Sequence, residues 1–275
     1  MDARDAKGPT YARYLCSTLW DNEDYYMQVD SHTRFVPSWD EKVIGMLRAL
    51  QENGIQKPLL SHYPMGFEDI DNPTHHVTHI CRSFVNDRGI PSFEGAEGHT
   101  PGLLPKRNLF IAAGMFVAPS QFLHDVPFDP DLPNLFVGEE ILLSARAYTH
   151  GWDVFTPSEN IVYHYYTRAS SPHFWDADRS PMNDADALVK VKFLLGLENT
   201  TVPEYLRKGL ARHGMGTKRS LADFHALVTH DYCRDGTPPH SSPTLIDQPF
   251  DPVLKMSLTL FILGICCFGT FWYLR

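Results

Sequence analysis

The chain has 275 residues, of which 43% are hydrophobic and 21% charged, and this composition is ordinary for a globular protein with room for one large domain or two small ones. Its net charge of −9 argues against a nucleic-acid-binding protein, because such proteins need basic patches. The five cysteines suggest no disulfide framework and favour a reducing compartment, since Cys266 and Cys267 lie in an apolar run and only three are left.

The first predicted elements are a helix and a strand. Tyr14, Leu15, Thr18 and Leu19 recur at helical spacing within residues 11–19. Residues 25–29 are aromatic or branched for the most part, which is typical of a strand. That strand runs directly into Asp30-Ser31-His32.

A helix is predicted from about Trp39 to Gly54, with Ser38 and Glu41 spaced as a capping box. A short strand is expected at 59–63, followed by a loop-rich, proline-containing stretch from 64 to 105. Residues 109–118 form a nearly continuous apolar run, which predicts a strand buried on both faces.

Further strands and helices alternate in the second half. A helix should begin at Glu139 and end at Gly151, and strands are expected around 152–155 and 160–166. Helices follow within 184–197 and 206–228. This alternation predicts an α/β fold, in which ligands bind beyond the carboxyl ends of the strands.

The C-terminal part differs in composition. Residues 231–254 are proline-rich and are expected to be a linker after a domain at 1–230. Residues 255–275 contain an uncharged run, 257–274, close to the roughly 20 residues that span a bilayer. They predict a single-pass transmembrane helix, with a buried core helix as the alternative.

The sequence leaves two alternatives for the side of the membrane that the domain faces. Lys255 and Arg275 flank the run on both sides, so the positive-inside rule does not choose an orientation. The N-terminus has no apolar leader segment, which favours a tail-anchored domain in the cytosol. A Golgi or ER lumenal domain is the alternative.

One pattern of residues indicates a metal site. Asp30 and His32 are two apart at the end of an extended segment, so both can reach one divalent cation, and this donor set suits Mn²⁺ or Mg²⁺. His164, after another strand-like run, is the candidate third ligand. The alternatives are a turn-forming aspartate with surface or half-buried histidines.

A rival metal pair is His75 and His79, four residues apart as in helical zinc sites. Their segment follows Pro73, is β-branched, and lacks the glutamate of zinc hydrolases.

Glu139 and Glu140 admit two interpretations. Acidic residues are favoured in the first turn of a helix by its dipole. Alternatively, one of them faces a cleft and binds a sugar or an acceptor hydroxyl.

Several ordered motifs carry a resemblance to a known family. They are AKGPTYAR at 6–13, YYMQVDSHTRF at 25–35, FIAAGMF at 110–116, FVGEEILLSAR at 136–146, THGWD at 149–153, HYYTR at 164–168 and GMGTKRS at 214–220. Over nearly all of residues 5–225 the chain resembles the hydroxyproline or polypeptide N-acetylglucosaminyltransferase family. In its active-site elements this family is similar to the polypeptide GalNAc-transferases.

The resemblance implies a GT-A fold, a UDP-GlcNAc donor, a divalent metal (Mn²⁺ or Mg²⁺), and retaining transfer to a hydroxyproline, threonine or serine hydroxyl of a polypeptide. Asp30, His32 and His164 match the metal ligands. Arg13 and Asp30 match positions that bind the donor, and Glu139 or Glu140 matches the acidic element beside the sugar and acceptor.

The chain departs from the family pattern in two respects. The chain is expected to lack the first βα unit of the GT-A fold, and to carry its anchor at the C-terminus. A catalytically inactive module that binds a nucleotide sugar or a protein is therefore the alternative function.

Overall fold

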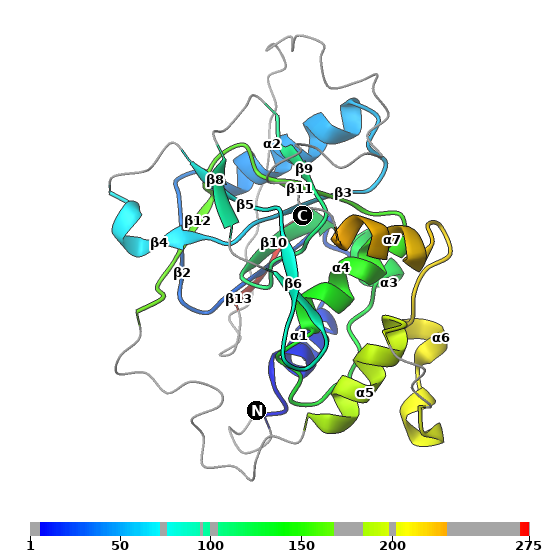
Figure 1. Ribbon diagram of the computed structural model, residues 1–275. Helices are drawn as coiled ribbons and strands as arrows, with labels where there is room; N and C mark the ends of the chain where they lie inside the picture. The colour runs from blue at the N-terminus through cyan, green and yellow to red at the C-terminus, as the bar shows by residue number, and fades with distance from the viewer. Residues whose placement is uncertain are drawn as a thin grey trace.

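The computed structural model describes residues 6–71, 76–93, 96–99, 104–167, 184–197, 202–229 and 270–274. Its centre is a six-stranded sheet with the order β13-β1-β10-β3-β11-β9 (Figure 1). These strands are β1 (Tyr25–Val29), β3 (Pro58–Ser61), β9 (Lys106–Asn108), β10 (Met115–Pro119), β11 (Asp153–Thr156) and β13 (Thr270–Leu274).

Smaller sheets surround this centre. One has the order β2-β12-β4, and two are antiparallel pairs, β5 with β8 and β6 with β7. Their bounds are β2 (Thr33–Phe35), β4 (Met65–Gly66), β5 (Val77–Ile80), β6 (Ser83–Val85), β7 (Pro91–Phe93), β8 (Ala96–His99) and β12 (Val162–His164).

The helices of the described residues are α1 (Pro9–Ser17), α2 (Trp39–Glu52), α3 (Gln121–Asp125), α4 (Glu139–Thr149), α5 (Ala185–Leu194), α6 (Leu210–His213) and α7 (Leu221–Val228). Two short 3₁₀ helices, η2 (Phe67–Asp69) and η4 (Glu204–Arg207), complete the set. None of these helices has the length and apolar character needed to cross a bilayer.

Helices cover both faces of the central sheet, because successive side chains of each strand point to opposite faces. On one face, Met27 and Val29 of β1 pack with Val43 and Leu47 of α2. On the other, Tyr26 lies in a core that takes in residues of α1, α3 and α4. A third core joins α4 to α5 and α7. The result is the mixed α/β fold that the alternation of elements predicts.

The carboxyl ends of three strands lie at the same end of the central sheet. Strands β1 and β3 each pair antiparallel with β10, so they run in the same direction, and β11 is parallel to β3. The segments that follow β1, β3 and β11 therefore leave the sheet at the carboxyl ends of these strands. Asp30 is the first residue after β1.

The predictions for β1, α2 and α4 are confirmed, and so is a helix near the N-terminus. The capping box before α2 is wrong, because Ser38 adopts a left-handed conformation and its side chain makes no capping hydrogen bond. Most of the stretch 64–105 was expected to be loop, but it contains β4, β5, β6, β7 and β8.

The apolar run 109–118 is a strand only from Met115 onward. Its first part bends, because side chains hold its backbone N–H groups. Leu109 and Phe110 donate to Asn108 Oδ1, at 2.7 and 3.3 Å. The next three amides find acceptors from distant segments: Ile111 on Ser144 Oγ (2.9 Å), Ala112 on Ser61 Oγ (2.8 Å) and Ala113 on Glu140 Oε1 (2.7 Å). Buried amides need such partners wherever a strand ladder does not supply them.

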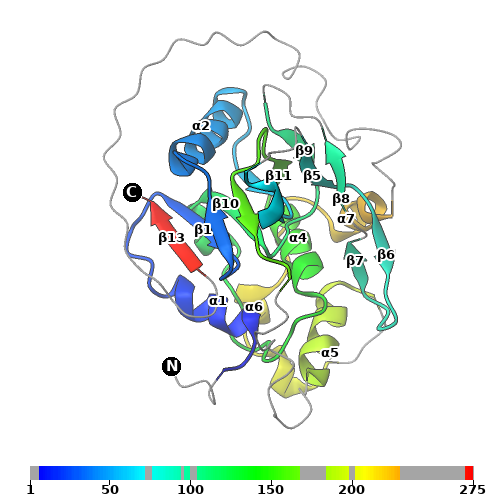
Figure 2. The same ribbon diagram turned by 90° about the vertical axis from the view of Figure 1, so that its left-hand side faces the viewer.

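Of the predicted linker and membrane helix at the C-terminus, the structure describes only residues 270–274. Residues 270–274 form β13, which pairs antiparallel with β1 at the edge of the sheet (Figure 2). There the backbone is extended instead of helical. The linker 231–254 and the remainder of the expected membrane helix, 255–269 and 275, lie outside the described residues.

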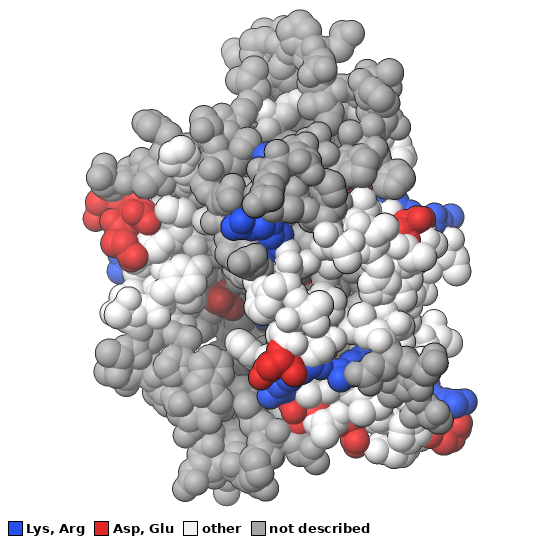
Figure 3. All heavy atoms as spheres, in the orientation of Figure 1, with Lys and Arg blue, Asp and Glu red and all other residues white. Residues whose placement is uncertain are grey.

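Cysteine chemistry differs from the expectation. Cys81, directly after β5, is buried and disulfide-bonded, although the sequence suggested no disulfide framework. On the face seen in Figure 3, the Lys and Arg side chains of the described residues lie in small separate groups. That face therefore presents no continuous basic surface in the described part of the chain.

Candidate active site at the end of strand β1

The site is built where β1 leaves the sheet. The backbone N–H of Asp30 donates to the carbonyl of Gly114 at 3.3 Å, which continues the pairing of β1 with β10 by one residue. The backbone approaches closely here, since a Cβ on Gly114 would lie 3.5 Å from Asp30 Oδ2 and 3.2 Å from Pro64 Cδ. Asp30 is thus fixed at the carboxyl end of β1, with 46% of its side chain exposed.

His164 is brought to Asp30 by the small sheet. Strand β12 pairs antiparallel with β2 and places His164 opposite Thr33, and Tyr165 N–H donates to the carbonyl of His32 at 3.0 Å. As a result, His164 Nε2 lies 3.6 Å from Asp30 Oδ2. The His164 ring is buried, whereas Asp30 is open to solvent.

His32 lies next to this pair without completing it. Its ring centre is 6.1 Å from that of His164, with the rings nearly perpendicular, and its Nδ1 is 2.9 Å from Ser31 Oγ. No group of three or more His, Cys, Asp or Glu side chains in the described ranges is arranged to hold a metal ion. The structure therefore brings Asp30 and His164 together and leaves His32 beside them.

The spacing of Asp30 and His164 fits a shared cation. Neighbouring ligands of an octahedral Mg²⁺ or a similar ion stand about 3 Å apart, close to the observed separation. A carboxylate with an imidazole suits Mn²⁺ better than a soft metal. These two side chains could hold a divalent ion, with His32 as the candidate third ligand.

Only one histidine of the rival pair lies within the described residues. His79 is buried and its Nδ1 lies 2.7 Å from Thr156 Oγ1, while His75 lies outside the described residues. His79 is therefore engaged within the core of the domain.

Arg13 and Glu139 pair with each other. Arg13 lies on α1 and Glu139 is the first residue of α4, and their side chains form an ion pair in which each residue is only 8% exposed. Burial lowers the pKa of Arg13, and the charges of Asp30 and Glu140 among others oppose this shift. Arg13 therefore lies close enough to the site to feel both carboxylates.

Glu140 has a different environment from its neighbour. Gly138, with φ of 95°, turns the chain into α4, and Glu140 lies in the first turn of that helix. Its Oε1 accepts from the N–H of Ala113, and its Oε2 accepts from the hydroxyl of Tyr63 at 2.8 Å. Burial raises the pKa of Glu140, although both hydrogen bonds and Arg13 act in the opposite direction.

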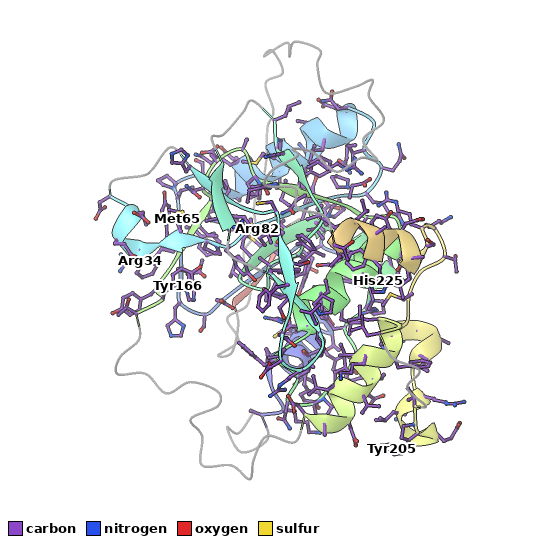
Figure 4. All side chains as sticks on the ribbon, in the orientation of Figure 1. Arg34, Met65, Arg82, Tyr166, Tyr205 and His225 are labelled. Atoms are coloured by element: carbon purple, nitrogen blue, oxygen red, sulfur yellow. The ribbon has the colours of Figure 1, made fainter. Side chains whose placement is uncertain are left out.

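Two tyrosines of the site were not found from the sequence. Tyr63 follows β3 and donates to Glu140, and burial together with that carboxylate raises its pKa. Tyr166, which is labelled in Figure 4, packs edge-on against His164 with the ring centres 4.5 Å apart, and it donates to the carbonyl of Pro64 at 2.7 Å. Burial and then the charges of Asp30 and Glu140 raise the pKa of Tyr166 to about 12. The only available signals were the place of Tyr63 at a strand end and that of Tyr166 two residues after His164.

Comparison with known proteins gives one family. The sequence profile of the glycosyltransferase (GlcNAc) family matches residues 1–233. Among solved structures, the chain is similar to GalNAc-T7 with UDP, GalNAc and Mn²⁺, at 12% identity and a TM-score of 0.47. That alignment covers 76% of this chain and 42% of the other. No curated protein sequence matches the chain.

The buried ion pair gives a stability prediction. In Arg13→Met, Glu139 keeps its buried charge without a partner, and the free energy of unfolding should fall by about 3–5 kcal/mol. Urea unfolding at pH 7.5 measures this loss. The double variant Arg13→Met/Glu139→Leu should recover most of it, because no unpaired charge is left.

A matched control for that prediction is the half-exposed surface pair of Lys42 and Glu159. Lys42→Met should cost less than about 1 kcal/mol, as surface ion pairs do. An Arg13→Met variant as stable as the wild type would contradict the importance of the buried pair.

A second prediction concerns Glu140 and pH. Because the pKa of Glu140 is raised in the folded protein, its carboxyl group keeps a proton there at a pH at which the same group in the unfolded chain has lost it. The contribution of Glu140 to stability is therefore full below the pKa of the unfolded chain, and it is lost as pH rises. Glu140→Gln should be more stable than the wild type at pH 7.5, and the difference should vanish near pH 4.

Urea midpoints measured across that pH range test this, with Glu52→Gln at an exposed position as the control. Equal midpoints for Glu140→Gln and wild type at pH 7.5 would show that the buried carboxylate carries no net cost.

Proposed function

The chain belongs to the glycosyltransferase (GlcNAc) family, and from this premise we propose that it is a GT-A enzyme that transfers N-acetylglucosamine from UDP-GlcNAc to a polypeptide hydroxyl. The acceptor is a hydroxyproline, threonine or serine side chain. The reaction retains the anomeric configuration and depends on a divalent metal.

The convergence of Asp30 and His164 beside Glu140 carries this proposal. A carboxylate and an imidazole from distant segments lie 3.6 Å apart at the carboxyl end of a central strand. In open α/β sheets, ligands bind at this edge. A further buried carboxylate with a raised pKa, that of Glu140, adds the usual mark of a functional site.

Asp30 and His164, with His32 beside them, would hold Mn²⁺ or Mg²⁺. When bound, the ion supplies positive charge to the donor diphosphate and to the leaving UDP. Asp30 also lies where it can accept a hydrogen bond from the donor, because nearly half of its side chain is exposed.

Glu140 is the residue we assign to the sugar and acceptor. Each of its oxygens accepts one hydrogen bond from the protein and keeps a further lone pair. The Tyr63 hydroxyl and the Ala113 amide fix the carboxylate, so that it can accept from a hydroxyl of the substrate. Its negative charge also stabilises the positive charge that develops at the anomeric carbon of the sugar during the transfer.

We propose that the transfer occurs on the front face of the sugar. The described site offers no carboxylate that is clearly placed as a nucleophile: Glu139 is paired with Arg13, and Glu140 is bound by Tyr63 and Ala113. In such a transfer the acceptor oxygen forms its bond to the anomeric carbon as the bond to the UDP oxygen breaks. The leaving phosphate then takes the acceptor proton.

A binding module without turnover is the second candidate. The ion pair of Arg13 with Glu139 favours it, because two residues expected to serve donor and acceptor satisfy each other. In that case the chain would bind a nucleotide sugar and not transfer it.

We expect the full chain to bind UDP only with Mn²⁺ or Mg²⁺ present, measured by calorimetry. His164→Ala and Asp30→Asn should each weaken this binding at least about tenfold, since the first removes a ligand of the ion and the second removes the negative charge of another. His124→Ala, an exposed histidine on α3, is the matched control and should change nothing.

Metal-dependent UDP binding that survives His164→Ala would rule out the metal assignment. Release of N-acetylglucosamine from UDP-GlcNAc, followed with labelled donor, separates the enzyme from the binding module. Binding without any release or transfer would favour the module.

We also propose that the C-terminal run anchors the protein to a membrane, with the side left open. In the anchored protein, residues 270–274 would be part of the membrane helix and would not pair with β1, because one segment cannot be both a sheet strand and a bilayer-spanning helix. Alkaline carbonate extraction of cell membranes should leave the full chain in the pellet and release a chain that ends at residue 254. Full release of the intact chain would contradict the anchor.

A further inference from the structure

A pocket adjoins Glu140 on the side of β7. Its volume is about 160 Å³, and residues of β7, the loop 136–138 and the start of α4 line it. The wall includes Pro91, Phe93, Phe136 and Ile141, together with Glu140 itself. Two phenylalanines, a proline and a branched side chain thus meet a carboxylate in one cavity.

The size and chemistry of the pocket select its ligand. A cavity of about 150 Å³ lined by apolar side chains takes up benzene, so this pocket has room for one apolar side chain of leucine, proline or phenylalanine type. Phe136, at 51% exposure, presents an aromatic surface to anything that enters from solvent. Aromatic rings provide large contact areas for such ligands.

The pocket lies apart from the predicted metal ligands. Asp30, His32 and His164 are absent from its wall, whereas Glu140 belongs to it. Glu140 in turn is bonded to Tyr63 and Ala113 on the sheet side. A group in the pocket therefore reaches Glu140 from a direction other than that of a ligand held by Asp30 and His164.

A sugar ring is a poor match for this wall. Each hydroxyl of a sugar needs a hydrogen-bond partner when it is buried. Besides the carboxylate of Glu140, the polar side chain of the wall is that of Ser92, whose hydroxyl accepts from Asn86 at 2.8 Å and keeps one proton to donate. Two polar side chains can satisfy only part of the hydroxyls of a sugar, whereas an apolar side chain needs no hydrogen-bond partner on this wall.

We propose that this pocket is a specificity subsite for an apolar side chain of the acceptor polypeptide, located next to the residue that receives the sugar. The inference rests on the proposed function, in which Glu140 faces the acceptor. The occupant of the pocket then sets which hydroxyl of a polypeptide is presented, because its neighbour along the peptide is placed against Glu140.

Fluorescence anisotropy with labelled peptides tests the subsite. The probes are seven-residue peptides with a central threonine or hydroxyproline, glycine elsewhere, and one leucine or one serine at each flanking position in turn. With the full chain, Mn²⁺ and UDP, at least one leucine peptide should bind about tenfold more tightly than its serine counterpart. Phe136→Ala should abolish this preference, and Phe136→Leu should keep most of it.

The matched control is Phe193→Ala, which removes a phenylalanine of similar exposure on α5, outside the wall. It should leave the preference for leucine intact. Equal binding of all leucine and serine peptides, or none by any, would overturn the subsite, as would a preference that survives Phe136→Ala.

Metal-dependent UDP binding by the same variants keeps the two proposals distinct. Phe136→Ala should bind UDP as the wild type does, because Phe136 is not among the residues assigned to the donor. If UDP binds and the leucine preference is absent, the subsite fails alone. If UDP does not bind and the preference is present, the donor assignment fails while the pocket stands.

Discussion

One buried guanidinium balances the charge on which the candidate site depends. Arg13 pairs directly with Glu139 and also feels the charges of Asp30 and Glu140. Three carboxylates near one strand end would repel one another without this cation, and burial would add its own cost. The single ion pair also joins α1 to α4, so the first described helix is fixed to the helix that carries both glutamates.

Much of the fold could be predicted where the pattern of one segment decides its structure. The aromatic and branched residues of β1 and the apolar face of α4 are local features, and both elements are where the sequence places them. Residues 109–114 could not be predicted in this way. They look like a strand because they are apolar, but their amides bond to Asn108, Ser61, Ser144 and Glu140, and most of these partners are remote in the chain.

The candidate site shows the same division. The strand-end position of Asp30 is visible in the sequence, and its meeting with His164 requires the pairing of β12 with β2. Nothing local distinguishes Glu139 from Glu140, since both open a helix. Their roles separate only because one side chain reaches Arg13 and the other reaches Tyr63. Tyr63 was likewise hidden, because its importance lies in a hydrogen bond across 77 residues.

The bent segment 109–113 makes the position of Glu140 depend on two distant elements. Three of its amides take acceptors on β3 and α4, which lie about 50 residues before it and about 30 after it. Buried amides that lose such acceptors are costly, so the path of the segment depends on both elements being in place. The Glu140 carboxylate is bound to that same segment, so a displacement of β3 is passed on to the candidate site through the backbone of residues 112 and 113.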